Sequence, residues 1–188
     1  MPALQARTQW WIGAALAALM IATRSAHLPA LHVLPPASWA VFFLAGVYLP
    51  RWAFGAFFAL AFGLDLHAIY VMDVSSFCFT PAYVWLLAAY GALWAAGRWY
   101  ARRHREAWTT LLPLALAVGV GAFAGEVLSG GSFYVFSGRF AELSFAEYAR
   151  QFTTYFPHTL GTTVFWVAVA ALVHGAIGAL RGQTQLDA

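Results

Sequence analysis

The single cysteine, Cys78, is the side chain with the most distinctive chemistry in this sequence. It stands two residues ahead of Thr80 and Pro81, and a Thr-Pro pair is typical of the start of a helix. The positive end of that helix dipole favours the thiolate, whereas the apolar neighbours Phe77 and Phe79 favour the neutral thiol. A coordinated metal ion would deprotonate the sulfur. Cys78 is therefore a candidate metal ligand, and the alternative is a small apolar residue that fills space.

Five ionisable side chains interrupt or border long apolar stretches: Arg24, Asp65, His67, Glu126 and His158. Ionisable residues in membrane segments are costly and usually functional. The alternative is that they reach the lipid headgroups, which suits the long Arg24 better than the short Asp65 among its apolar neighbours. All five fall near the same end of the predicted helices. We therefore predict a polar solute site that opens to the outer side of a membrane.

The composition sets the class of protein that must position these residues. The chain has 188 residues, of which 62% are hydrophobic and only 9% are charged, against about 25% in an ordinary soluble domain. The mean hydropathy is +0.70. These values exclude a cytosolic globular domain and a disordered chain, and the continuous apolar runs exclude an outer-membrane barrel. The prediction is an all-α protein that lies in the lipid bilayer, and no basic patch points to nucleic acid.

Six apolar stretches predict a six-helix transmembrane bundle that forms one domain over residues 1–188. The predicted spans are 10–23, 37–49, 52–70, 81–100, 111–128 and 157–180. Arginine placement predicts the orientation, because cytoplasmic loops are enriched in basic residues. With both termini inside, the cytoplasmic side holds seven arginines and the outer side three; the outer ones are Arg24, Arg139 and Arg150.

Two further patterns concern the loops and a possible partner. Ser144 and Glu147 have the spacing of a capping box, which predicts a short helix carrying Arg150 within the outer connection 129–156. The absence of lysine excludes a P-loop, so any ATP-driven step needs another chain. A stripe of small residues on the first helix would let such a partner approach closely, or would pack inside the bundle. Its members are Ala14, Ala18 and Ala22.

The sequence around Cys78 carries a resemblance. The stretch from Gly63 to His67 (Gly-Leu-Asp-Leu-His), followed by Phe77-Cys-Phe-Thr-Pro-Ala-Tyr83, is similar to the BtuM family. These are solitary S-component-like cobalamin transporters of the energy-coupling-factor type. The resemblance implies a six-helix S-component fold in a bacterial inner membrane. It also implies cobalamin as the ligand and the alanine stripe as the contact to a coupling module.

The resemblance also implies roles for individual residues. Cys78 would bind the corrin cobalt as an axial ligand, with cobalamin base-off, and would assist removal of cyanide from cyanocobalamin. Asp65, Tyr83 and Arg150 match the polar residues around that site. Arg24 and His67 complete the predicted substrate-binding set, because an arginine can meet the nucleotide phosphate. Two alternatives stay open. One is a redox protein with haem, quinone or a metal ion near Cys78, His67 and Glu126, and the other is an S-component for another vitamin.

Overall fold

The structure is a computed structural model that describes residues 5–24, 34–105 and 107–186, except for the side chains of Cys78 and of residues 181–186. This part of the chain folds into six α-helices and contains no strand, so the predicted all-α class is confirmed. Short 3-10 turns occur at Ser76–Cys78, Pro81–Val84 and Trp108–Thr110. The helices are α1 Ala6–Arg24, α2 Ser38–Tyr48, α3 Ala53–Tyr70, α4 Trp85–Ala101, α5 Leu111–Phe136 and α6 Phe145–Leu186.

The core is centred on α2, the shortest of the six helices. Phe42 and Phe43 are fully buried there, and almost every other residue of α2 is buried with them. Two glycines bring α2 against α4: a side chain on Gly46 would collide with the carbonyl of Trp94, and one on Gly97 would collide with the carbonyl of Phe43. Close backbone approach at small residues is a common way of packing helices in membranes.

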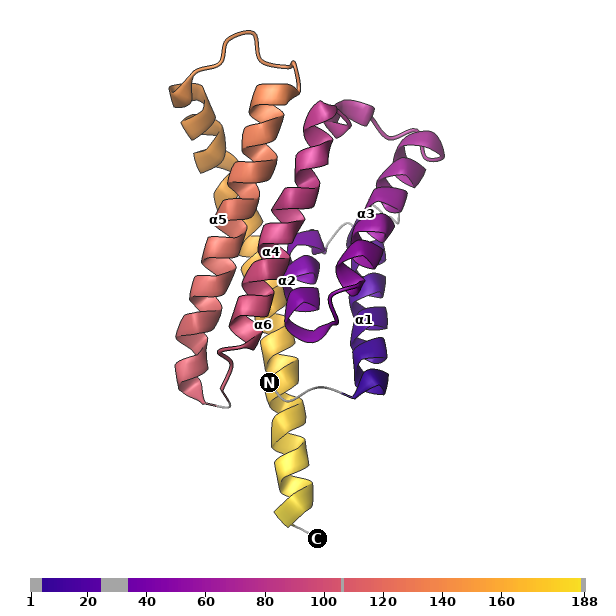
Figure 1. Ribbon diagram of the computed structural model, residues 1–188, viewed down its shortest axis with the longest axis vertical. Helices are drawn as coiled ribbons and strands as arrows, with labels where there is room; N and C mark the ends of the chain where they lie inside the picture. The colour runs from indigo at the N-terminus through magenta and orange to yellow at the C-terminus, as the bar shows by residue number, and fades with distance from the viewer. Residues whose placement is uncertain (1–4, 25–33, 106, 187–188) are drawn as a thin grey trace.

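The other helices pack around α2 (Figure 1). Helices α1 and α3 lie on one side, α5 lies on the other, and α4 runs between them, while α6 starts beside α5 and crosses to the middle of the bundle. The α3–α4 and α5–α6 connections lie at one end of the bundle, and α1 begins and α6 ends toward the opposite end. The two ends of the described chain therefore lie toward the same end of the molecule.

Three helical segments in the described residues are long and apolar enough to cross a membrane: Ala53–Tyr70, Trp108–Phe136 and Phe145–Leu180. Helix α2 is apolar but has only 11 residues. At 1.5 Å per residue it spans about 16 Å, roughly half of a hydrocarbon core. The membrane character of the chain thus rests on three helices, and the six-span arrangement remains a prediction.

The outward face of α5 has the surface that a lipid environment needs. Large apolar side chains recur along it at spacings of three and four residues, which places them on one helix face. They are Leu112, Leu116, Val120, Phe123 and Val127, and each is between 39% and 68% exposed. A continuous apolar stripe of this length would be poorly hydrated in water.

The second half of the chain differs from the predicted boundaries. Helix α5 continues to Phe136 instead of ending near residue 128, so the connection shrinks to residues 137–144. The Ser144 side chain does cap the next helix, accepting from the Glu147 amide over 3.1 Å. That helix is not a separate short one, because it continues through Pro157 as part of the 42-residue α6. Proline is tolerated inside membrane helices more readily than the soluble-protein rule suggests.

Candidate functional site

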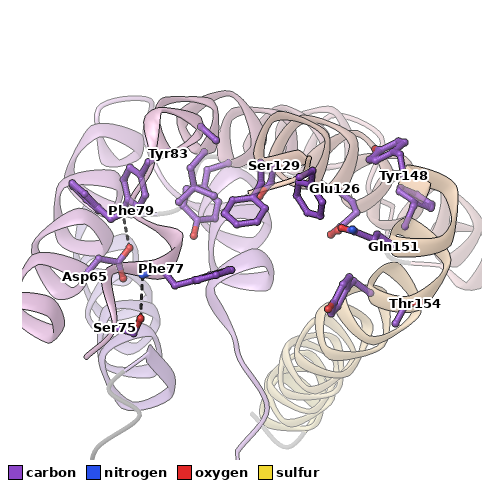
Figure 2. Close-up of a pocket in the computed structure, with 18 of the residues that line it drawn as sticks. Asp65, Ser75, Phe77, Phe79, Tyr83, Glu126, Ser129, Tyr148, Gln151 and Thr154 are labelled. Carbon is purple, nitrogen blue, oxygen red and sulfur yellow. Dashed lines mark hydrogen bonds between the residues drawn. The ribbon is translucent and has the colours of Figure 1, made fainter. Parts of the chain in front are cut away.

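A cavity of about 880 Å³ opens at the end of the bundle where the α3–α4 and α5–α6 connections lie. Its volume falls in the upper part of the range of small-molecule sites, about 300–1,000 Å³. One wall comes from α1, α3 and the turn before α4, and the opposite wall comes from α5 and the first turns of α6 (Figure 2). Aromatic rings dominate the lining: Phe77, Phe79, Tyr83, Tyr90, Phe133, Phe140, Tyr148, Phe152 and Tyr155.

The first wall contains an ion pair between Arg24, the last residue of α1, and Asp65 on α3. The Arg24 Nε donates to Asp65 Oδ1 over 2.7 Å, and Nη2 donates to Oδ2 over 2.6 Å. The two side chains are only 16% and 23% exposed. A two-pronged guanidinium–carboxylate pair fixes orientation as well as charge. It therefore joins α1 to α3 and leaves this wall electrically neutral.

Three hydroxyl groups complete the network around this pair. The Arg24 Nη1 donates to the Ser38 hydroxyl over 2.9 Å and to the Tyr90 hydroxyl over 3.0 Å. The Tyr83 hydroxyl donates to Asp65 Oδ2 over 2.6 Å. The network thus connects α1, α2, α3, α4 and the turn before α4 at one point. Such fully partnered polar clusters fix one arrangement of the helices around them.

The structure brings together three of the predicted substrate-binding residues, Arg24, Asp65 and Tyr83, but it pairs them with one another. Both Asp65 oxygens already accept hydrogen bonds. Ser38 and Tyr90 were not among the predicted residues. Tyr90 had a signal in the sequence, because it follows Tyr83 by seven residues and so falls on the same face of a helix. Ser38 had none, since its role depends on where α2 begins relative to Arg24.

The other two predicted substrate-binding residues have different positions. His67 is exposed and is not part of the cavity lining. The reason is its spacing from Asp65, because two residues along a helix point to nearly opposite faces. Arg150 does line the cavity, at its exposed edge. It is paired with Glu147 through Nε at 3.0 Å and Nη2 at 2.8 Å.

The backbone of Cys78 ends the 3-10 turn Ser76–Cys78 beside the cavity. Its sequence neighbours Phe77 and Phe79 both contribute to the lining. The side chain of Cys78 lies outside the described residues, so the predicted sulfur–metal role stays a prediction. Among the described residues no group of three or more His, Cys, Asp or Glu side chains is arranged to hold a metal ion.

The helix predicted to start at Pro81 begins in a different way. Pro81 opens a 3-10 turn, and the regular α4 starts only at Trp85. The Thr80 side chain makes no capping hydrogen bond, and its buried hydroxyl has no partner in the described part of the chain. The tight turn places Tyr83 where its hydroxyl reaches Asp65. Thr80 therefore holds the predicted N-cap position and Pro81 the first helical position, but the turn is 3-10, the capping hydrogen bond is not made, and the α-helix starts four residues later.

A single arginine connects the two loops at the mouth of the cavity. The guanidinium of Arg139, in the α5–α6 connection, lies 3.9 Å from the centre of the Phe77 ring. Its Nη2 also donates to the Phe77 carbonyl over 3.1 Å. Phe133 on α5 packs against the same ring, with centroids 5.8 Å apart. Arg139 thus holds the turn that contains Cys78 against the opposite wall.

The second wall carries the other acidic residue of the lining, Glu126 on α5. Figure 2 shows it with Gln151 and Tyr148, across the cavity from Asp65. The Tyr148 hydroxyl is buried and has no hydrogen-bond partner among the described residues. A side chain on Gly131 would lie 3.3 Å from that hydroxyl, so the glycine makes room for the phenol. The Glu126 and Tyr148 side chains on this wall therefore make fewer hydrogen bonds than the side chain of Asp65 does.

A second polar cluster lies at the opposite end of the bundle, around a cavity of about 220 Å³. The rings of His104 and His174 meet edge to face with centroids 5.5 Å apart. The Tyr100 hydroxyl lies 2.8 Å from His104 Nδ1, and the Tyr48 hydroxyl lies 3.5 Å from His174 Nδ1. The contacts of His174 are those of a packed side chain.

Comparisons with known proteins do not name this site: no protein-family model matches the chain, and no curated protein matches it. The function has to be argued from the cavity and its two walls. The cavity has the volume of a large-ligand site, a mostly aromatic lining and four charged side chains, Arg24, Asp65, Glu126 and Arg150. This arrangement is suited to binding a large, partly flat ligand that carries polar substituents.

Proposed function

We propose that this chain binds a corrinoid in the 880 Å³ cavity and takes part in cobalamin uptake across a bacterial inner membrane. The observation that carries the proposal is the position of Cys78 in the chain. It lies between Phe77 and Phe79, two residues that line the cavity, in a turn at the cavity mouth. A thiolate there is a suitable axial donor for the cobalt of a ligand seated below it.

The rest of the lining suits the chemistry of a corrinoid. The corrin macrocycle is large and flat, and aromatic side chains on both walls offer it apolar surface. Its edge carries carboxamide groups, which need hydrogen-bond acceptors and donors. Its nucleotide arm carries a phosphate, for which Arg150 at the exposed edge is a matching partner. Arg150 can exchange Glu147 for that phosphate, because the present pair is exposed to solvent.

Cobalt coordination by Cys78 gives a route to loss of cyanide. The thiolate replaces the dimethylbenzimidazole of the ligand on one face of the corrin, and its electron pair forms the Co–S bond. The bond to cyanide on the opposite face weakens, and cyanide leaves with the electron pair of the Co–C bond. Cobalt keeps its oxidation state, and the thiol proton leaves with cyanide as HCN. The step is a ligand exchange and needs no external reductant.

A transport cycle would need a second chain to supply energy, because this one has no lysine for a P-loop. The alanine stripe is available for such a partner. Ala14 and Ala18 are exposed, and Ala22 is half-buried, while Leu16 and Met20 form the buried face of α1. We propose that a coupling module docks on this stripe.

Growth of a cobalamin-requiring bacterium that lacks its own inner-membrane importer tests the proposal. The parent chain should restore growth on limiting cyanocobalamin. Ala68→Trp should strongly reduce growth, because Ala68 lines the cavity and a tryptophan there takes up space that the ligand needs. Ala59→Trp is the matched control, since Ala59 lies on the same helix but is exposed. Growth with Ala68→Trp at the parent level, at equal protein abundance, would contradict the proposal.

A further inference from the structure

The two ion pairs at the cavity leave one lining carboxylate, that of Glu126, without a cationic partner among the described residues. Four charged side chains line the cavity. Arg24 and Asp65 neutralise each other, and Arg150 is neutralised by Glu147, which lies outside the lining. These are the two ion pairs among the described residues, and neither includes Glu126. Among the described residues, the half-buried Glu126 carboxylate is thus the one charge of the lining that has no oppositely charged partner.

Few hydrogen bonds reach the Glu126 carboxylate from the described residues. The hydroxyl of Thr159 on α6 lies within hydrogen-bonding reach of the carboxylate. That hydroxyl has one proton, which it shares between this carboxylate and the Tyr155 carbonyl at 3.2 Å. The Gln151 amide nitrogen donates to Glu147 over 3.2 Å. A carboxylate has about four acceptor positions, so one shared hydroxyl leaves Glu126 able to accept from a ligand.

We propose that Glu126 is a specificity-determining residue that binds an N–H group of the ligand and selects a carboxamide over the corresponding carboxylate. This inference rests on the proposed corrinoid function, because a corrinoid presents carboxamides around its edge. The role falls to Glu126 because both oxygens of Asp65 already accept from Arg24 and Tyr83. A ligand carboxylate at the same point would face Glu126 with a like charge.

Equilibrium binding to the purified, detergent-solubilised chain tests the inference. The ligands are cyanocobalamin and its monocarboxylic acids, in each of which one side-chain amide is hydrolysed to the acid. The parent should bind at least one of these acids about 10- to 150-fold more weakly than cyanocobalamin, the value of a charge-assisted hydrogen bond. Glu126→Gln should reduce that preference to less than about 3-fold, because the like-charge repulsion disappears. Glu126→Asp should retain it, since the charge remains.

Glu142→Gln provides the matched control, because Glu142 is exposed in the α5–α6 connection and does not line the cavity. It should keep the preference of the parent. If the parent binds cyanocobalamin and all the acids within twofold of one another, the inference about Glu126 is wrong while the proposed function stands. A parent that binds no corrinoid overturns both. An unchanged preference in a folded Glu126→Gln variant would also overturn the inference.

Discussion

The two walls of the cavity each contain one carboxylate, and the two carboxylates have opposite surroundings. Asp65 accepts two hydrogen bonds from Arg24 and one from Tyr83. Glu126 takes part in neither of the ion pairs among the described residues. The carboxylate of the first wall is thus paired with an arginine that joins two helices, whereas the carboxylate of the second wall has no cationic partner among the described residues. An ionisable residue in an apolar helix can therefore be tied into the fold, as Asp65 is, or be left without a cationic partner, as Glu126 is in the described part of the chain.

The largest expected difference between the two walls is in how much the loss of a charged side chain lowers the free energy of unfolding. Arg24→Leu leaves the Asp65 carboxylate shielded and unpaired, and should lower the free energy of unfolding by about 3 kcal/mol, near the lower end for buried pairs because both side chains keep some exposure. Glu126→Leu removes an uncompensated charge and should leave stability within about 1 kcal/mol of the parent. Reversible unfolding in mixed micelles measures both.

The double variant Arg24→Leu/Asp65→Leu is the control for this difference. Removing both charges should recover a large part of the stability that Arg24→Leu loses, since no uncompensated charge remains. Equal losses in the single and double variants would show that Arg24 stabilises the fold through Ser38 and Tyr90 rather than through Asp65.

Two tyrosine variants, one on each wall, should show the same difference with smaller changes in the free energy of unfolding. Tyr83→Phe removes a hydrogen bond to a carboxylate and should destabilise the protein by about 1.5–3 kcal/mol. Tyr148→Phe removes a buried hydroxyl that has no partner among the described residues, and should be neutral or slightly stabilising. Unfolding of both variants under identical conditions decides the matter. A larger loss for Tyr148→Phe than for Tyr83→Phe would reverse our assignment of the two walls.

The smallest effect concerns the contact between the walls at the cavity mouth. Arg139→Gln loses the contact with the Phe77 ring and should speed dissociation of bound corrinoid by about 2- to 5-fold. Arg103 stacks on Trp99 in the same manner, at 4.0 Å, on the far side of the bundle from the cavity. Arg103→Gln should therefore leave the dissociation rate unchanged. Stopped-flow measurement of ligand release distinguishes them, and equal acceleration by both would contradict a local role for Arg139.

Much of the fold could be predicted because its signals are local. Apolar runs of suitable length predict helices. Both boundaries of α2, α3 and α4 fall within four residues of the boundaries of the predicted spans. The continuation of α6 through Pro157 could not be predicted in this way. The rule that proline ends helices reflects soluble proteins, whereas helices in membranes tolerate it when neighbouring groups satisfy the freed backbone.

The sequence predicts which residues belong to the candidate site better than it predicts which of them pair with one another. The sequence shows that Arg24, Asp65 and Glu126 are ionisable residues in apolar surroundings, and all three line the cavity. It does not show that Arg24 pairs with Asp65, because the two lie 41 residues apart and their contact depends on how α1 packs against α3. That packing gives Asp65 an arginine partner and leaves Glu126 without one among the described residues.

The central claim is that Cys78 binds the cobalt of a corrinoid seated in this cavity. The most direct measurement is the absorption spectrum of purified protein mixed with cyanocobalamin and followed over time, for the parent and for Cys78→Ser. We expect the parent to give a base-off, thiolate-bound spectrum and to release cyanide. The serine variant, which offers a hard and poorly ionised hydroxyl, should keep the spectrum of unreacted cyanocobalamin even where corrinoid still binds. A serine variant that changes the spectrum and releases cyanide as fast as the parent would contradict the claim.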